Sequence, residues 1–110
     1  MPGMTRQRVP GFHDYHSNLM ECIDWCLDEQ KRQQSVYQSM REKLSRTDLG
    51  YKADVMRIDL SCLARDQMTI NGQLERAVSD DEKVRPIYML IRLLIRKGHI
   101  LSELETLLYS

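Results

Sequence analysis

The segment 86–109 carries apolar residues around most of a helical circumference. When the chain is wound at about 100° per residue, its leucine, isoleucine and tyrosine side chains cover roughly two thirds of the turn. A helix with so wide an apolar surface must be covered by at least two other helices, from its own chain or from another one. The polar residues fall on one narrow line, formed by Arg85, Arg92, Arg96, His99 and Glu103.

Two earlier segments have seam positions that recur at intervals of three and four residues, which is the spacing of a coiled-coil seam. The first seam consists of Ile23, Cys26, Gln30, Gln33, Tyr37, Met40 and Leu44. The second seam consists of Ala53, Met56, Leu60, Leu63, Gln67, Ile70, Leu74 and Ala77. Because only the short connection 47–50 separates the two segments, we expect their helices to be antiparallel neighbours.

Capping signals indicate where these two helices begin and end. The first helix is expected over about 12–46, and its clearest start signal is Asn18, which Glu21 follows in a pattern like a capping box. The second helix is expected over 51–78. It should continue through Gly72, because the seam keeps its phase there.

The third helix has two candidate starts. Ser79 and Glu82 form a capping-box pair, but a helix that begins there would contain Pro86, which removes a backbone hydrogen bond inside a helix. We therefore expect the third helix over 86–109, with Pro86 in its first turn. Gly98 predicts a kink or a short break within it.

These elements predict an all-α protein. The first two helices form an antiparallel hairpin, and the strongly apolar third helix packs against it, either in a three-helix bundle or in a coiled-coil-like oligomer. Residues 12–110 are expected to form a single helical domain. Residues 1–11, which contain two of the three prolines and no periodicity, are expected to form a flexible arm.

Charge balance and cysteine count narrow the class of protein. Lysine plus arginine and aspartate plus glutamate both number 16, whereas a nucleic-acid-binding protein usually has a basic excess. Arg92, Arg96 and Lys97 interrupt the longest apolar stretch, so we expect no membrane span. Three cysteines and the absence of a secretion signal in the sequence favour a reducing compartment. A cytoplasmic protein is expected, with a nuclear one as the alternative.

The residues that have the right chemistry for a catalytic or metal site lack the required spacing. His13, His16, Cys22 and Cys26 are of zinc-binding types, but on one helix the histidines project nearly opposite the cysteines. The sequence contains no phosphate-binding loop, nucleophile elbow or HExxH motif. We therefore expect no metal, no cofactor and no enzymatic activity.

The third helix contains the pattern LxxLL twice, at Leu90–Leu94 and at Leu104–Leu108. This pattern resembles the helical docking box of nuclear-receptor coactivators, which implies a helix that binds in a groove of another protein. The two copies are two heptads apart, as the positions of one continuous core seam would also be. We interpret both copies as core packing.

The function expected from these patterns is that of a non-enzymatic protein-interaction module: an oligomerising scaffold, an adaptor or a small subunit of a larger assembly. Its partner is another protein or a second copy of the chain. A small helical chaperone for an aggregation-prone helix is the alternative, since seven methionines offer an adaptable surface. A nucleic-acid-associated regulator that uses the arginine line is a third hypothesis.

The candidate partner-binding residues come from the first and third helices. Gln30 and Gln33 occupy seam positions where aliphatic residues would stabilise more, which is typical of a contact with a specified register or of a solvated part of a seam. The predicted partner-binding residues are Leu90, Leu93, Ile100, Leu104, Gln30, Gln33 and Tyr37.

Overall fold

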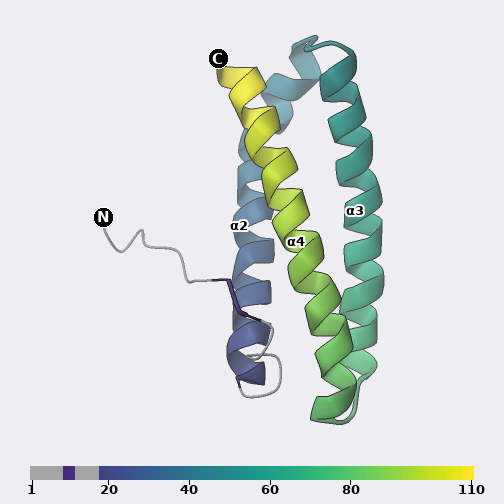
Figure 1. The fold of residues 1–110 in the computed structure, drawn as a ribbon. Coiled ribbons are helices and arrows are strands. Elements are labelled where there is room, and N and C mark those ends of the chain that lie inside the picture. Colours follow the sequence, from purple (N-terminus) through teal and green to yellow (C-terminus); the bar gives the residue numbers. More distant parts are fainter. Residues whose placement is uncertain (1–8, 12–17) are drawn as a thin grey trace, which may run out of the picture.

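The computed structural model describes residues 9–11 and 18–110, and the second of these ranges contains three long helices. They are α2 (Leu19–Arg46), α3 (Tyr51–Arg76) and α4 (Asp80–Tyr109). α3 runs antiparallel to α2, and α4 then turns back to run antiparallel to α3 (Figure 1). The described ranges contain no strand, so the prediction of an all-α three-helix bundle is confirmed.

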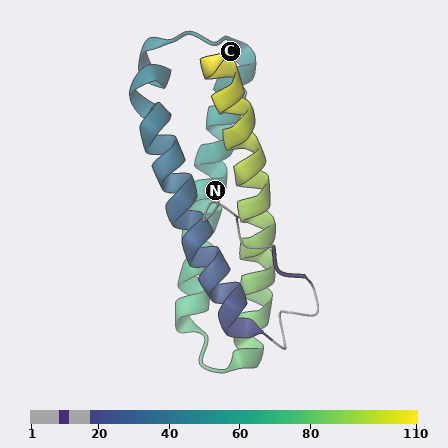
Figure 2. The same ribbon diagram turned by 90° about the vertical axis from the view of Figure 1, so that its left-hand side faces the viewer.

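α4 is the helix that the other two share. It packs along both α2 and α3, whereas no Cα atom of α2 lies within 8 Å of a Cα atom of α3. Figures 1 and 2, which are related by a turn of 90°, both show α4 alongside its two neighbours. The first two helices are therefore antiparallel as predicted, but each of them packs closely against α4 and not against the other.

The core consists of two apolar clusters, one towards each end of the bundle. The first is formed by Cys22, Trp25, Cys26, Ile70, Ile87, Leu90, Ile91, Leu93 and Leu94. The second is formed by Met40, Leu44, Ala53, Met56, Leu60, Leu101, Leu104 and Leu108. α4 contributes to both clusters, so its wide apolar surface is covered within one chain by two other helices.

α4 begins at Asp80, so the expected start at Pro86 is wrong. The backbone N–H of Glu82 donates to Ser79 Oγ at 3.3 Å, and Ser79 Oγ donates to Glu82 Oε1 at 3.1 Å. Acidic residues in the first turn add a favourable interaction with the helix dipole. Together with the burial of the Pro86 ring, these contacts offset the hydrogen bond that proline removes.

α4 also continues through Gly98, where the sequence predicted a kink or a short break. The glycine lies where α2 and α4 approach closely. A Cβ atom at this position would stand 3.3 Å from Nε2 of Gln33 and 3.8 Å from Oε2 of Glu29. The absence of a side chain at Gly98 therefore serves helix packing and does not end the helix.

The other helix ends follow the sequence signals more closely. α2 ends at Arg46 and α3 continues through Gly72, both as predicted. α2 begins directly after Asn18, although the Asn18 side chain makes no capping hydrogen bond. The part of the first helix predicted over 12–17, and residues 1–8 of the predicted arm, lie outside the described residues.

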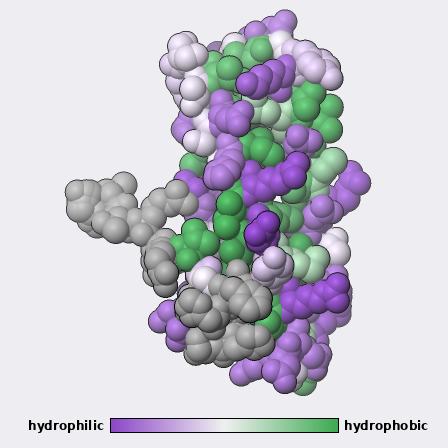
Figure 3. All heavy atoms as spheres, viewed as in Figure 1, coloured by the Kyte–Doolittle hydropathy of each residue, from purple (hydrophilic) through white to green (hydrophobic). Residues whose placement is uncertain are grey.

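The surface of the bundle mixes polar and apolar side chains. On the face seen in Figure 1, the two kinds are interleaved along the whole length of the molecule (Figure 3). Arg85, Arg92 and Arg96 of the predicted arginine line are exposed on α4. Among the described helices, none is both long enough and apolar enough to cross a membrane.

Candidate functional site

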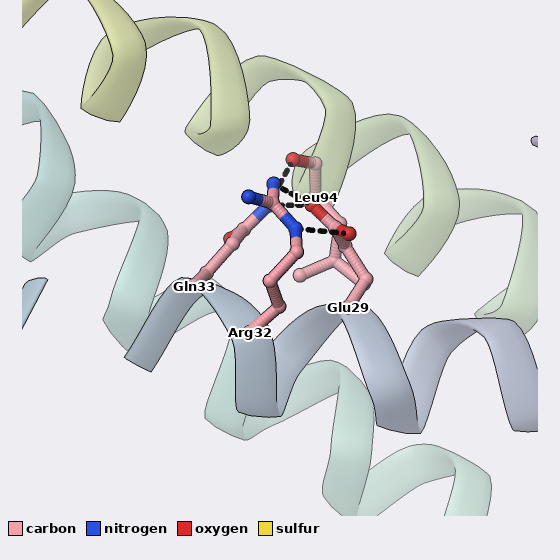
Figure 4. Close-up of polar contacts among 4 residues, drawn as sticks. All are labelled: Glu29, Arg32, Gln33 and Leu94. Atoms are coloured by element: carbon pink, nitrogen blue, oxygen red, sulfur yellow. Dashed lines mark hydrogen bonds and ion pairs between the residues drawn. The ribbon is translucent and has the colours of Figure 1, made fainter. Parts of the chain in front are cut away.

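A layer of polar side chains crosses the bundle between its two apolar clusters. Where α2 meets α4, Gln33 is 2% exposed and Glu29 is 6% exposed. Nε2 of Gln33 donates hydrogen bonds to Glu29 Oε2 at 2.8 Å and to the backbone carbonyl oxygen of Leu94 at 2.7 Å (Figure 4). Within the described part of the chain, Gln33 Oε1 has no hydrogen-bond partner. This amide ties α2 to the backbone of α4 at one register.

Arg32 compensates the charge of the buried Glu29 carboxylate. Its Nε donates to Oε1 of Glu29 at 2.9 Å, and its Nη2 donates to Oε2 at 2.6 Å, which makes a two-pronged ion pair (Figure 4). The hydrogen bond to Glu29 is the main reason why the pKa of Arg32 is raised. Both carboxylate oxygens of Glu29 are thus hydrogen-bonded, and the ion pair joins two residues of the same helix, α2.

The other side of the polar layer joins α2 to α3. Oε1 of Gln30 accepts hydrogen bonds from Gln67 Nε2 and from Asn71 Nδ2, both at 2.8 Å. Nζ of Lys97, on α4, donates to Gln67 Oε1 at 2.8 Å. A chain of hydrogen bonds therefore connects all three helices across the space between α2 and α3.

An open groove of about 520 Å³ lies along this space. α2 and α3 supply most of its lining, and α4 contributes Lys97 and Leu101. Among its apolar side chains, Leu27 is 50% exposed and Met68 is 75% exposed. The complete lining among the described residues is Leu27, Gln30, Lys31, Gln33, Gln34, Tyr37, Arg57, Leu60, Ser61, Ala64, Gln67, Met68, Lys97 and Leu101.

The charged residues of the groove are all cations. Lys31 comes from α2, Arg57 from α3 and Lys97 from α4, and no aspartate or glutamate occurs among the described residues of the lining. Lys97 is half-buried, and no described carboxylate forms an ion pair with it. Burial lowers the pKa of Lys97, because its ammonium group has lost part of its hydration. The groove therefore offers positive charge inside an otherwise uncharged lining.

The predicted partner-binding residues of the third helix lie mainly in the core. Leu90, Leu93 and Leu104 are buried, and Ile100 is partly buried. α2 and α3 cover these side chains, because the wide apolar surface of α4 finds its partners within the chain. A partner would reach them only if the bundle opened.

The predicted residues of the first helix lie closer to the accessible surface. Gln30 and Tyr37 line the groove, and Gln33 reaches it from its buried position beside α4. Leu27 and Met68 also line the groove, but the sequence pattern did not predict this, because both residues lie outside the three-four seams. The sequence does contain one indication of the groove. Glutamines occupy positions in both seams, and they mark where aliphatic packing between the helices is interrupted.

The LxxLL copies and the cysteines belong to the core. Leu90, Leu94, Leu104 and Leu108 are buried, which confirms the interpretation of the two copies as core packing. Cys22 and Cys26 are also buried, and desolvation raises the pKa of Cys26 to about 12. No group of three or more metal-ligating side chains occurs in the part of the chain that the structure describes, and His13 and His16 lie outside it.

The molecule is a three-helix bundle in which α4 packs against both α2 and α3, and an open groove lies between α2 and α3. Comparisons of this chain with protein-family models, with curated proteins and with solved structures found no match.

Proposed function

We propose that this chain is a non-enzymatic protein-interaction module that binds an amphipathic helix of a partner protein in the groove between α2 and α3. The observation that carries this proposal is the arrangement of the helices. α4 packs on both neighbours, while α2 and α3 stand apart and leave apolar side chains exposed between them. A fourth helix in this position would complete a four-helix bundle, which is a common arrangement of packed helices.

The lining of the groove suits a helix as its occupant. Leu27 from one wall and Met68 from the other are exposed, and Leu60 and Leu101 lie deeper. Burial of exposed apolar area is the main favourable term in such an association. Met68 can adapt to different partner side chains because its thioether chain is unbranched. The small side chain of Ala64 leaves room on the α3 wall for a ridge of partner side chains.

The chaperone hypothesis would use the same groove, but it predicts a chain that is unstable without its client. Both apolar clusters of this bundle are closed by residues of the one chain, which favours a module that folds alone. Light scattering of the purified chain separates the two: a stable 13.0 kDa monomer supports the module, and aggregation supports the chaperone. A nucleic-acid-associated regulator would instead show binding to DNA or RNA that weakens steeply with salt.

The proposal is tested with a displayed library of helical peptides. Each peptide has about 18 residues, which span about 27 Å as a helix. The outer face is fixed as alanine and glutamine, and the seam positions are randomised. We expect the full chain to select binders.

Two tryptophan substitutions locate the binding site. Ala64→Trp fills the groove and should abolish binding, whereas Ser35→Trp, an exposed position on α2 outside the lining, should leave it intact. Circular dichroism checks that both variants remain helical. The proposal is overturned if no peptide is selected, or if binding survives in the Ala64→Trp variant. A dimer that Ala64→Trp dissociates would assign the groove to a second copy of the chain.

A further inference from the structure

We propose that the helix bound in the groove carries a carboxylate, from glutamate or aspartate, at the centre of its apolar seam, and that this carboxylate pairs with Lys97. This inference rests on the proposed function and specifies the chemistry of the partner. It comes from three observations: where Lys97 lies, what it bonds to, and which charges surround it.

Lys97 projects from α4 into the part of the groove where the polar layer crosses the bundle. Its side chain is half-buried, and Nζ donates to Gln67 Oε1 at 2.8 Å. That acceptor is a neutral amide oxygen, and no described carboxylate forms an ion pair with Lys97. An occupant that covers the groove would remove more water from this ammonium group, so the occupant must supply compensation.

A carboxylate is the compensation that the surrounding groups favour. A carboxylate adds the attraction between opposite charges to the hydrogen bond of the ammonium group, whereas the neutral amide oxygen of Gln67 offers only a dipole. The Gln67 amide belongs to a chain with Gln30 and Asn71, so its Nε2 keeps a partner when its oxygen gives up the lysine. The lysine can therefore change its acceptor without leaving the whole amide network unpaired.

The charges around the groove also favour a carboxylate on the partner. Lys31 and Arg57 add positive charge from the two walls, and no described aspartate or glutamate lines the groove. Two other hollows of the surface differ in this respect. The hollow between α3 and α4 is lined by Asp66 as well as by Arg92, and the one at the α3–α4 turn is lined by Asp81 and Glu82. The α2–α3 groove thus has only positively charged residues in its described lining and favours an anionic side chain, whereas those two hollows contain acidic residues.

The inference predicts a specific residue preference in the peptide library described above. Among peptides selected by the full chain, the central seam position should be enriched in glutamate and aspartate at least tenfold over glutamine and asparagine. The fixed outer face is uncharged, so the enrichment reports the seam alone. In the Lys97→Met variant the acidic enrichment should disappear and leucine or methionine should replace it. In Lys52→Met, an exposed lysine outside the groove, the acidic enrichment should persist.

A pair of synthetic peptides that differ only by glutamate or glutamine at the central position gives the second measurement. The full chain should bind the glutamate peptide at least tenfold more tightly, and Lys97→Met should bind the two about equally. Binders without an acidic preference would overturn this inference and leave the proposed function standing. An acidic preference that persists in Lys97→Met would also overturn it, because Lys31 and Arg57 would then be its cause. The absence of any binder would overturn the proposed function and this inference with it.

Discussion

The two sides of the polar layer use the same residue type in opposite ways. Gln33 faces α4, is almost completely buried, and bonds to Glu29 and to the backbone of Leu94. Gln30, one turn earlier on α2, faces α3 across the groove and bonds to side chains that are themselves partly exposed. The buried amide fixes how α2 and α4 pair, whereas the amide at the groove can exchange partners. The polar layer thus includes a closed interface between α2 and α4 and an open groove between α2 and α3.

The largest expected difference between the two sides comes from placing a negative charge on each. Gln33→Glu would bury a second carboxylate beside Glu29 and opposite the carbonyl oxygen of Leu94, so we expect a loss of about 3–5 kcal/mol in the free energy of unfolding. Gln30→Glu places the charge in the partly exposed groove that Lys97 also lines, and should cost about 1 kcal/mol or less. Urea unfolding of both variants measures the difference. Equal losses would contradict the distinction between the two sides.

A truncation of one leucine in the core and of another in the groove tests the distinction between closed and open apolar surfaces. Leu90→Ala leaves a cavity in a fully buried position and should cost about 2–5 kcal/mol. Leu27→Ala removes a half-exposed side chain and should cost about 1 kcal/mol or less, yet it should weaken peptide binding. Thermal unfolding and peptide titration supply the two readouts. If Leu27→Ala proved as destabilising as Leu90→Ala, the groove would be closed in solution.

Alkaline pH should weaken the closed region through Cys26. Its pKa is raised from 9.0 to about 12 in the folded chain, so its contribution to stability is complete below pH 9 and is lost as the pH rises towards 12. Between pH 8 and 10 the loss should be on the order of 1 kcal/mol. Lys97, with its lowered pKa, contributes a change of the opposite sign that Cys26→Ala leaves in place. Parallel pH series of the parent and Cys26→Ala should therefore diverge; superimposable slopes would show that the thiol ionises freely.

The smallest expected effect concerns two glycines inside helices. Gly72→Ala should stabilise by about 0.5–1 kcal/mol, because its new methyl group meets only the flexible Arg76 side chain. Gly98→Ala gains the same helix propensity but pushes its methyl group against the buried Gln33 amide. We expect no net gain at Gly98, measured by thermal unfolding. A stabilisation equal to that of Gly72→Ala would mean that α2 and α4 are packed less closely there.

The sequence predicted the fold because the hydrophobic residues of α4 cover most of its circumference, so that other helices must pack around it. It did not predict where α4 begins, since the cap at Ser79 favours a start at that point, whereas Pro86 disfavours a helix that includes it. The pattern of a seam also does not say which helix will fill it. Gln30 and Gln33 therefore suggested a contact with a specified register, but only the structure shows that Gln30 bonds to Gln67 of α3 and that Lys97 of α4 bonds to the same Gln67 amide.

Methionine methyl groups can report whether the open groove binds a partner helix while the bundle stays closed. The chain is labelled with ¹³C at its methionine methyl groups and titrated with the tightest glutamate-containing peptide from the library. Met68 lines the groove, Met40 is fully buried in the core, and Met20 is exposed outside the groove lining. We expect a large shift of the Met68 signal and no shift of Met20 or Met40. A shift of Met20 without Met68, or a shift of Met40, would contradict this expectation, because the peptide would then bind elsewhere or open the bundle.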